Sequence, residues 1–261
     1  MANWMQGTGL SGGDRIFIEL VKRWQLKLNI TLFLSKEGSA ICQRQELGNI
    51  NQQIWASDFM SRWGYFADIL YRTTNSIIKV ISVKTVSGDI IFSSSDFWPD
   101  SFPALILKRR NPKILWIAGF YLFAPKPWQK DSPYHGKSFL IGLLYWLGQQ
   151  PTYYIIRKFA DIVFVTSQPD VDQFTTNIRS KEKVIVIRGG VDTVSAKHYL
   201  NSKNVIPPEK RTYDACFAGR FHYQKGVLEL IKIWKAVCQK IPQAHLAMIG
   251  SGPLDKEVRS L

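Results

Sequence analysis

One short segment of the chain combines two cations with closely spaced glycines, a pattern suited to holding a diphosphate. Residues 217–226 read FAGRFHYQKG. We expect a strand to run into Gly219 and a helix to open at Gly226, with Arg220 and Lys225 in the loop between them. Helix-terminal amides favour anions, Arg grips an oxyanion with two hydrogen bonds, and Lys adds a point charge. The alternative is a surface turn whose basic residues face water, because short motifs also match by chance.

A second glycine-rich segment lies near the start of the chain, where residues 7–15 read GTGLSGGDR. Gly7, Gly9 and Gly12 fit G-x-G-x-x-G, which indicates a dinucleotide site only between a strand and a helix. A helical stripe follows, but the preceding MANWMQ is too short and too polar for the first strand of a doubly wound domain. Glu37 lies about where a ribose-binding acid is expected. An NAD(P)-dependent oxidoreductase therefore remains an alternative at this point.

Strands alternate with helices along the chain, which predicts an α/β fold with parallel sheets. We expect Pro151 to separate two apolar helices. The expected strands are 30–34, 89–94, 114–123, 162–166, 184–187, 213–218 and 245–249, and the expected helices are 14–27, 66–71 with the stretch around residue 77, 101–110, 137–148, 152–159, 171–178 and 226–239.

Polar residues and two prolines at 195–211 indicate a connection between two domains, 1–205 and 206–261. The second domain has roughly two strands, where about five or six are usual. Together with the missing first strand, this predicts that the chain is a fragment lacking material at both ends.

Composition narrows the choice of partner and compartment. The chain has 34 Lys and Arg against 20 Asp and Glu, a net charge of +14, which favours nucleic acid, phosphorylated ligands or an acidic membrane. Against nucleic acid, the aromatic residues cluster in apolar runs, and no known RNA- or DNA-binding motif occurs. Cys42, Cys216 and Cys238 form neither a disulfide framework nor a zinc site, which suits a reducing cytosol. With no secretory signal and no apolar run near ~20 residues, we expect a cytoplasmic protein.

Six segments, taken in order, resemble the retaining, GT-B-fold glycosyltransferases of family 4 (glycosyl transferases group 1), which use nucleotide-sugar donors. The most specific of the six is G-R-F-x-x-x-K-G. The segments are 11–20 (SGGDRIFIEL), 93–100 (SSSDFWPD), 160–168 (ADIVFVTSQ), 184–192 (VIVIRGGVD), 217–231 (FAGRFHYQKGVLELI) and 247–254 (AMIGSGPL).

The resemblance implies two Rossmann-like domains, with 1–205 on the acceptor side and 206–261 as the start of the nucleotide-sugar domain. It implies that Arg220 and Lys225 are catalytic, since they would hold the donor diphosphate and neutralise the leaving nucleotide. It implies a UDP- or GDP-linked donor, a glycan or lipid-linked acceptor, retained configuration, and neither metal nor further cofactor. The donor-binding residues that it implies are Gly12, Gly13, Gly219, Arg220, Lys225, Gly250 and Gly252. It also favours a sugar nucleotide over NAD, because the second domain matches as well.

The sequence departs from this family at two places. Many relatives carry a histidine just after the strand that corresponds to 114–123, and this stretch has none. The family's two nucleotide-binding glutamates would lie beyond Leu261, and Glu257 has no acidic partner at their spacing. We assign no role to His135 or His222. A truncated, non-catalytic homologue that binds a nucleotide or a membrane is therefore an alternative to an active transferase.

Two apolar, aromatic segments with basic neighbours raise the question of membrane contact. They are 114–124 and the helix at 139–148, FLIGLLYWLG. Such segments suit peripheral binding to anionic lipid at the inner face of the membrane. They equally suit a buried parallel strand and a helix that covers the sheet. The sequence leaves both interpretations open.

Overall fold

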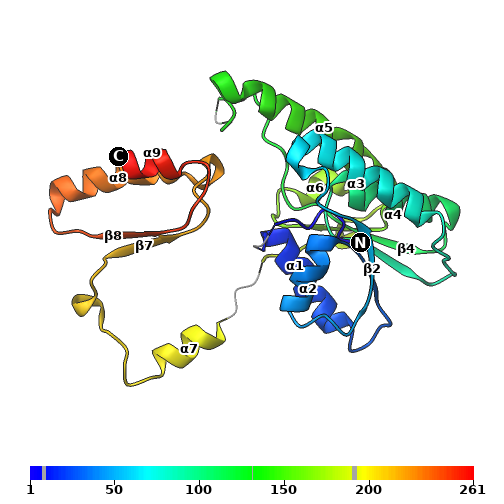
Figure 1. The fold of residues 1–261 in the computed structure, drawn as a ribbon, viewed down its shortest axis with the longest axis horizontal. Helices are drawn as coiled ribbons and strands as arrows, with labels where there is room; N and C mark the ends of the chain where they lie inside the picture. Colours follow the sequence, from blue (N-terminus) through cyan, green and yellow to red (C-terminus); the bar gives the residue numbers. More distant parts are fainter. Residues whose placement is uncertain (8–9, 131, 190–192) are drawn as a thin grey trace. The chain divides into compact units, whose positions relative to one another are not determined.

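A computed structural model describes residues 1–7, 10–130, 132–189 and 193–261 of the chain. Contacts within the chain separate two compact units, traced in Figure 1. The first comprises Met1–Gln129 and Gly136–Gly190, and the second comprises Lys130–His135 and Val191–Leu261. The polar connection expected at 195–211 falls within the second unit, and the boundary after residue 205 stays a prediction.

Parallel strands form the centre of the first unit. β1 (Thr31–Ser35) pairs with β2 (Asn51–Ala56), and a four-stranded sheet has the order β3 (Ile90–Ser93), β4 (Leu115–Gly119), β5 (Ile162–Val165), β6 (Val184–Val186). Trp116, Val163 and Phe164 of the central strands are buried, as expected of a sheet covered on both faces. Ile54, Ile90 and Ile185 are exposed. The predicted α/β class with parallel sheets is confirmed.

Met1 and Ala2 join these two sheets, although they form no named strand. Ala2 makes a parallel bridge with Leu34 and its amide donates to the Phe33 carbonyl at 2.8 Å. On the other side, the Ser94 amide donates to the Met1 carbonyl at 2.9 Å. Residues 1–2 therefore occupy the first-strand position of a doubly wound sheet, and the strand order reverses between them and β3.

Helices cover both faces of this sheet. Figure 1 shows α1 and α2 on one side and α3, α4 and α5 on the other. Alternate strand residues supply two cores, with Ile117 facing Phe17 and Val21 of α1, and Trp116 facing Leu107 and Ile156. The helices are α1 (Gly12–Trp24), α2 (Lys36–Arg44), α3 (Tyr65–Val80), α4 (Trp98–Arg110), α5 (Phe139–Phe159) and α6 (Val171–Phe174), with 3-10 turns η1 (Ser61–Trp63), η2 (Gly136–Ser138) and η3 (Lys181–Lys183).

The predicted break at Pro151 is wrong, because α5 runs continuously through this residue. A proline inside a helix removes one backbone donor and crowds the preceding turn. Side chains supply donors here: Trp98 Nε1 donates to the Gly148 carbonyl at 2.7 Å, and Thr152 Oγ1 donates to the Gln149 carbonyl at 2.9 Å. Packing of α5 against α4 therefore outweighs the local preference.

Two other predicted elements are shorter than expected. The strand predicted over 114–123 ends at Gly119, and the helix predicted over 171–178 ends at Phe174. The buried guanidinium of Arg179 donates to the Phe174 carbonyl at 3.0 Å and to the Ile156 carbonyl at 2.8 Å. The carbonyl at which α6 stops is thus satisfied by a side chain five residues further along the chain.

The second unit repeats the strand–helix alternation on a smaller scale. β7 (Ala215–Ala218) pairs in parallel with β8 (Leu246–Ile249), and α8 (Val227–Lys240) connects them, as predicted. α9 (Asp255–Ser260) follows β8, while α7 (Val194–Leu200) and two 3-10 turns, η4 (Pro208–Lys210) and η5 (Tyr223–Lys225), complete the unit. Its core is formed by Phe221, Val227 and Leu254.

Candidate functional site

The glycine loops that follow β7 and β8 are joined through their backbones. The Gly219 amide donates to the Ile249 carbonyl, and the Phe221 amide donates to the Ser251 carbonyl, both at 2.9 Å. The carboxyl ends of parallel strands meet at one edge of a sheet, which is where open α/β sheets bind ligands. The structure therefore brings the two glycine segments of the second unit together.

Two of the predicted donor-binding glycines have a structural reason to lack a side chain. A Cβ at Gly250 would lie 1.9 Å from the Gly219 carbonyl oxygen, and a Cβ at Gly252 would lie 2.4 Å from the Phe221 carbonyl oxygen. Real Cβ atoms do not approach a backbone oxygen so closely, so the loops could not pack as they do with alanine. The role of these glycines toward a ligand stays a prediction.

Basic side chains gather before α8. Arg220 and Lys225 are exposed, and no ion pair within the described part of the chain engages either one. His222 lies between them in sequence, and its pKa is lowered by burial and then by the charges of Arg220 and Lys225. Gly226 begins α8 with a φ of +62°, and no side chain caps the helix. An uncapped helix N-terminus beside two free cations is suited to an anion.

The glycine turn of the first unit differs, because the N-terminus of α1 is already capped. The Asp14 amide donates to Ser11 Oγ at 3.2 Å, and the Ser11 amide donates to Asp14 Oδ2 at 3.0 Å. A Cβ at Gly13 would lie 3.0 Å from the Tyr121 ring, whereas a Cβ at Gly12 would meet open space. Gly9, part of the dinucleotide fingerprint, lies outside the described residues.

Glu37, considered above as a ribose-binding acid, forms an ion pair with Arg72 in the structure. Glu37 Oε1 accepts from Arg72 Nη2 at 2.7 Å, and the fully buried Arg72 also binds Asp68 at 3.0 Å. Arg72 Nη1 further donates to the Asn3 carbonyl at 3.3 Å. Removing one partner of a buried ion pair leaves an uncompensated charge, so Glu37 has a structural role at this position.

The two apolar segments that raised the membrane question have different environments. Most of residues 114–124 belong to the core, since Trp116, Ala118 and Phe120 are each 0% exposed, although Leu122 is 56% exposed. The first half of α5 instead presents apolar side chains to solvent, with Leu140 62% and Ile141 64% exposed. Within the described residues, the search for a helix long and apolar enough to cross a bilayer finds no candidate.

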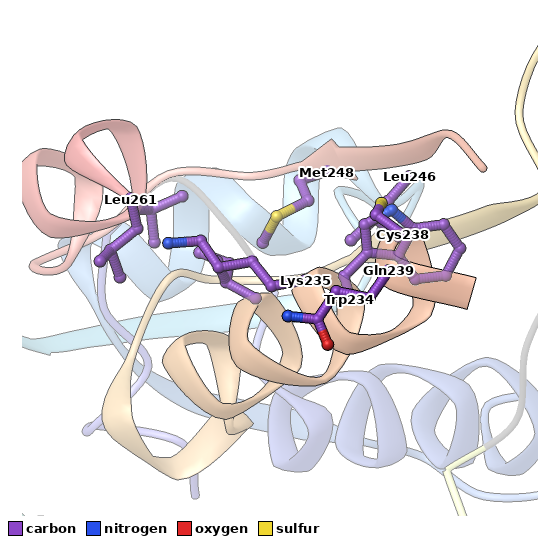
Figure 2. A pocket seen from close by; sticks show the side chains of 9 residues that line it. Trp234, Lys235, Cys238, Gln239, Leu246, Met248 and Leu261 are labelled. Atoms are coloured by element: carbon purple, nitrogen blue, oxygen red, sulfur yellow. The ribbon is translucent and has the colours of Figure 1, made fainter. Parts of the chain in front are cut away.

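The second unit also contains an apolar groove of about 540 Å³, shown in Figure 2. Its walls come from α8, β8 and α9, and the labelled side chains include Trp234, Cys238, Met248 and Leu261. The residues lining it do not include Arg220 or Lys225. The sequence analysis predicted the helix that forms one wall but not the groove.

Sequence reasoning missed a carboxyl group at the turn after β3. Asp96 lies in the SSSDFWPD segment, and Gln149 Nε2 of α5 donates to its Oδ2 at 2.8 Å. Burial raises the pKa of Asp96 to about 6, although the hydrogen bond from Gln149 opposes this shift. This segment is one of the six that carry the family resemblance, but the resemblance implied no role for Asp96. Nothing in the sequence indicated Gln149 as its partner.

The described residues include no group of three or more His, Cys, Asp or Glu side chains placed to hold a metal ion.

Comparisons with known proteins agree with the observed fold and show which proteins the chain is similar to. No protein-family model matches the chain. The uncharacterized glycosyltransferase MJ1059 of Methanocaldococcus jannaschii is 24% identical over 197 residues, which is 74% of this chain and 46% of that protein. The chain thus spans about half the length of this curated relative.

Among solved structures, Anabaena Alr3699/HepE in complex with UDP matches 98% of this chain and 61% of its own, with a TM-score of 0.55 and 14% identity. Its complex with UDP and glucose has a TM-score of 0.56, with 14% identity and coverage of 98% and 63%. The GT-B-like α/β fold predicted from the sequence is confirmed by these matches. The chain is therefore similar in sequence to a protein named a glycosyltransferase and similar in fold to HepE.

Proposed function

We propose that the protein transfers a sugar from a UDP- or GDP-linked donor to a glycan or lipid-linked acceptor, with retained configuration. The observation that carries this proposal is the uncapped N-terminus of α8 beside the exposed Arg220 and Lys225. The relative named a glycosyltransferase and the structural neighbour solved with UDP support it. Since the chain spans about half of that relative, the proposal concerns the activity of the whole protein.

In the proposed reaction, the glycosidic bond to the donor phosphate breaks and negative charge develops on the departing nucleoside diphosphate. Arg220 and Lys225 would stabilise that charge, helped by the amides at the start of α8. Gly219, Gly250 and Gly252 would let the backbone approach the donor. The donor-binding role of Gly12 and Gly13 in the first unit stays a prediction. The proposal requires neither a metal nor a further cofactor.

We also propose that the protein works in the cytoplasm, at the inner face of a membrane. The twelve residues 139–150 at the start of α5 carry no charge, and Lys137 precedes them while Arg157 and Lys158 end the helix. A helix that exposes apolar side chains beside basic ones suits an anionic lipid interface. We expect the double variant Leu140→Glu with Ile141→Glu to lose sedimentation with phosphatidylglycerol vesicles. Ile81→Glu, similarly exposed on the first unit, is the matched control.

The donor site is tested by calorimetric titration with UDP and GDP. Lys225→Ala and Arg220→Ala should each weaken binding about tenfold, because each removes a charge-assisted hydrogen bond. Lys232→Ala, an exposed lysine on α8 itself, should leave affinity within twofold. Unchanged binding in Lys225→Ala would refute the assignment of the pocket. Nucleotide release from UDP- and GDP-sugars then separates an enzyme from a binding module, which would bind without turnover.

A further inference from the structure

The turn after β3 holds a carboxyl group that the proposed donor chemistry does not use. Asp96 receives a hydrogen bond from Gln149 Nε2 at 2.8 Å, and within the described residues no Lys, Arg or His forms an ion pair with it. Asp100, four residues later, is instead held by the Asn3 amide and by Ser95 Oγ, both at 2.6 Å. A carboxylate accepts about four hydrogen bonds. Asp96 therefore retains acceptor capacity that this structure leaves unused.

The partner of Asp96 is rigidly positioned. Gln149 is 5% exposed, its Oε1 accepts from the Ala124 amide at 2.8 Å, and its Nε2 also donates to the Leu122 carbonyl at 2.8 Å. Both ends of the side-chain amide are thus fixed by the loop after β4. Because Gln149 cannot turn away without breaking these bonds, the Asp96 carboxyl is held in one orientation.

Aromatic rings surround this carboxyl. Asp96 and Gln149 line a crevice of about 10 Å³ together with Tyr65, Phe97, Trp98 and Tyr145. That volume holds about one water molecule or one hydroxyl group. A larger ligand would therefore place a single group inside the crevice and keep its other atoms outside. The Tyr65 ring, 44% exposed at the rim, packs edge-on against Trp4 with centroids 5.6 Å apart. An exposed and fixed aromatic face therefore lies beside the opening.

The single carboxylate and the aromatic ring beside it favour some classes of ligand over others. A carboxylate repels phosphate and other anions, and one carboxylate is too few for a divalent cation, which prefers six or more oxygen ligands. A neutral polyhydroxyl compound fits, since one hydroxyl would donate to Asp96 while a C–H face of its ring packs on Tyr65. Leu144 and Leu147, on either side of Tyr145, are exposed. They would suit an apolar group attached to such a compound.

We propose that this crevice binds a hydroxyl group of the acceptor sugar, with Asp96 as the hydrogen-bond acceptor and Tyr65 as the stacking surface. The inference rests on the proposed transferase function and deepens it, because it names the acceptor as a neutral glycan and assigns its site to the first unit. Burial raises the pKa of the Tyr65 phenol to about 12, so it stays a neutral hydroxyl beside the carboxylate.

The test uses saturation-transfer NMR of the full chain with glucose, galactose, mannose and N-acetylglucosamine as separate probes. At least one sugar should receive saturation from the wild type. Asp96→Asn and Tyr65→Ala should each weaken its binding about tenfold, because a hydrogen bond to a charged group or a stacking face is lost. Asp58→Asn, which changes an exposed carboxyl of the same unit, is the matched control.

Titration with UDP separates this inference from the donor-site proposal. Asp96→Asn should bind UDP within twofold of the wild type, because the inference gives Asp96 no part in donor binding. If no probe sugar binds, or if Asp96→Asn binds it as tightly as the wild type does, the acceptor site is refuted whatever the UDP result. Sugar binding that depends on Asp96, without UDP binding, supports the crevice and refutes the proposed donor function.

Discussion

Replacing Asp96 by asparagine should stabilise the first unit at neutral pH. Burial raises the pKa of this carboxyl from 3.8 to about 6. Ionising Asp96 therefore costs more free energy in the folded chain than in the unfolded one. A rise of about two pH units, at about 1.36 kcal/mol each, corresponds to roughly 3 kcal/mol. Asparagine keeps an oxygen that accepts from Gln149 Nε2 but carries no charge, so the variant should recover most of this free energy.

The sign of the pH dependence is fixed by the direction of the shift. Between pH about 4 and 6, the folded chain holds a proton on Asp96 that the unfolded chain has released. This stabilising contribution is complete below pH about 4 and is lost as pH rises through about 6. The wild type and Asp96→Asn should therefore have similar unfolding free energies near pH 4. They should differ by about 2–3 kcal/mol near pH 8.

Urea unfolding followed by tryptophan fluorescence measures this difference. Eight of the nine tryptophans belong to the first unit, at positions 4, 24, 55, 63, 98, 116, 128 and 146, so the signal reports mainly on that unit. Asp58→Asn, at an exposed site, controls for the change in net charge. If Asp96→Asn were less stable than the wild type near pH 8, the carboxylate would be a stabilising group. This result would contradict the expected destabilisation of the folded chain by the buried carboxylate.

Three further predictions concern the second unit. UDP affinity should rise more steeply with falling pH in the wild type than in His222→Gln. Burial and then the charges of Arg220 and Lys225 lower the pKa of His222, and a bound diphosphate would offset those charges; parallel titrations of the two proteins over a range of pH check it. Glu229→Gln should strengthen UDP binding about twofold to fivefold in the same assay, because it removes a carboxylate from the first turn of α8. Gly250→Ala should destabilise the unit by about 2 kcal/mol or more and open it to limited proteolysis, since its Cβ would lie 1.9 Å from a backbone oxygen. For comparison, Gly148→Ala on α5 of the first unit, with no atom within 4 Å of its Cβ, should be tolerated.

Much of the fold could be predicted from local patterns. Runs such as 162–165 (IVFV) and the apolar stripe of α1 encode a buried strand and a helix by their own periodicity. Features that depend on distant contacts could not be predicted. α5 continues through Pro151 because Trp98 bonds to it from another helix, and Met1 and Ala2 take a strand position because β1 and β3 both supply hydrogen bonds. The link between Asp96 and Gln149 spans 53 residues, and no local rule predicts it.

The two glycine turns show why a sequence motif alone does not locate an anion site. Both α1 and α8 begin at or beside glycines, and both have unpaired amides at their first turn in principle. In α1, Ser11 and Asp14 form a capping box that satisfies two amides. In α8 no side chain caps the turn, and the nearby loop contributes two exposed cations. The chemistry of the capping residues, rather than the glycine spacing, therefore places the diphosphate at α8 in our proposal.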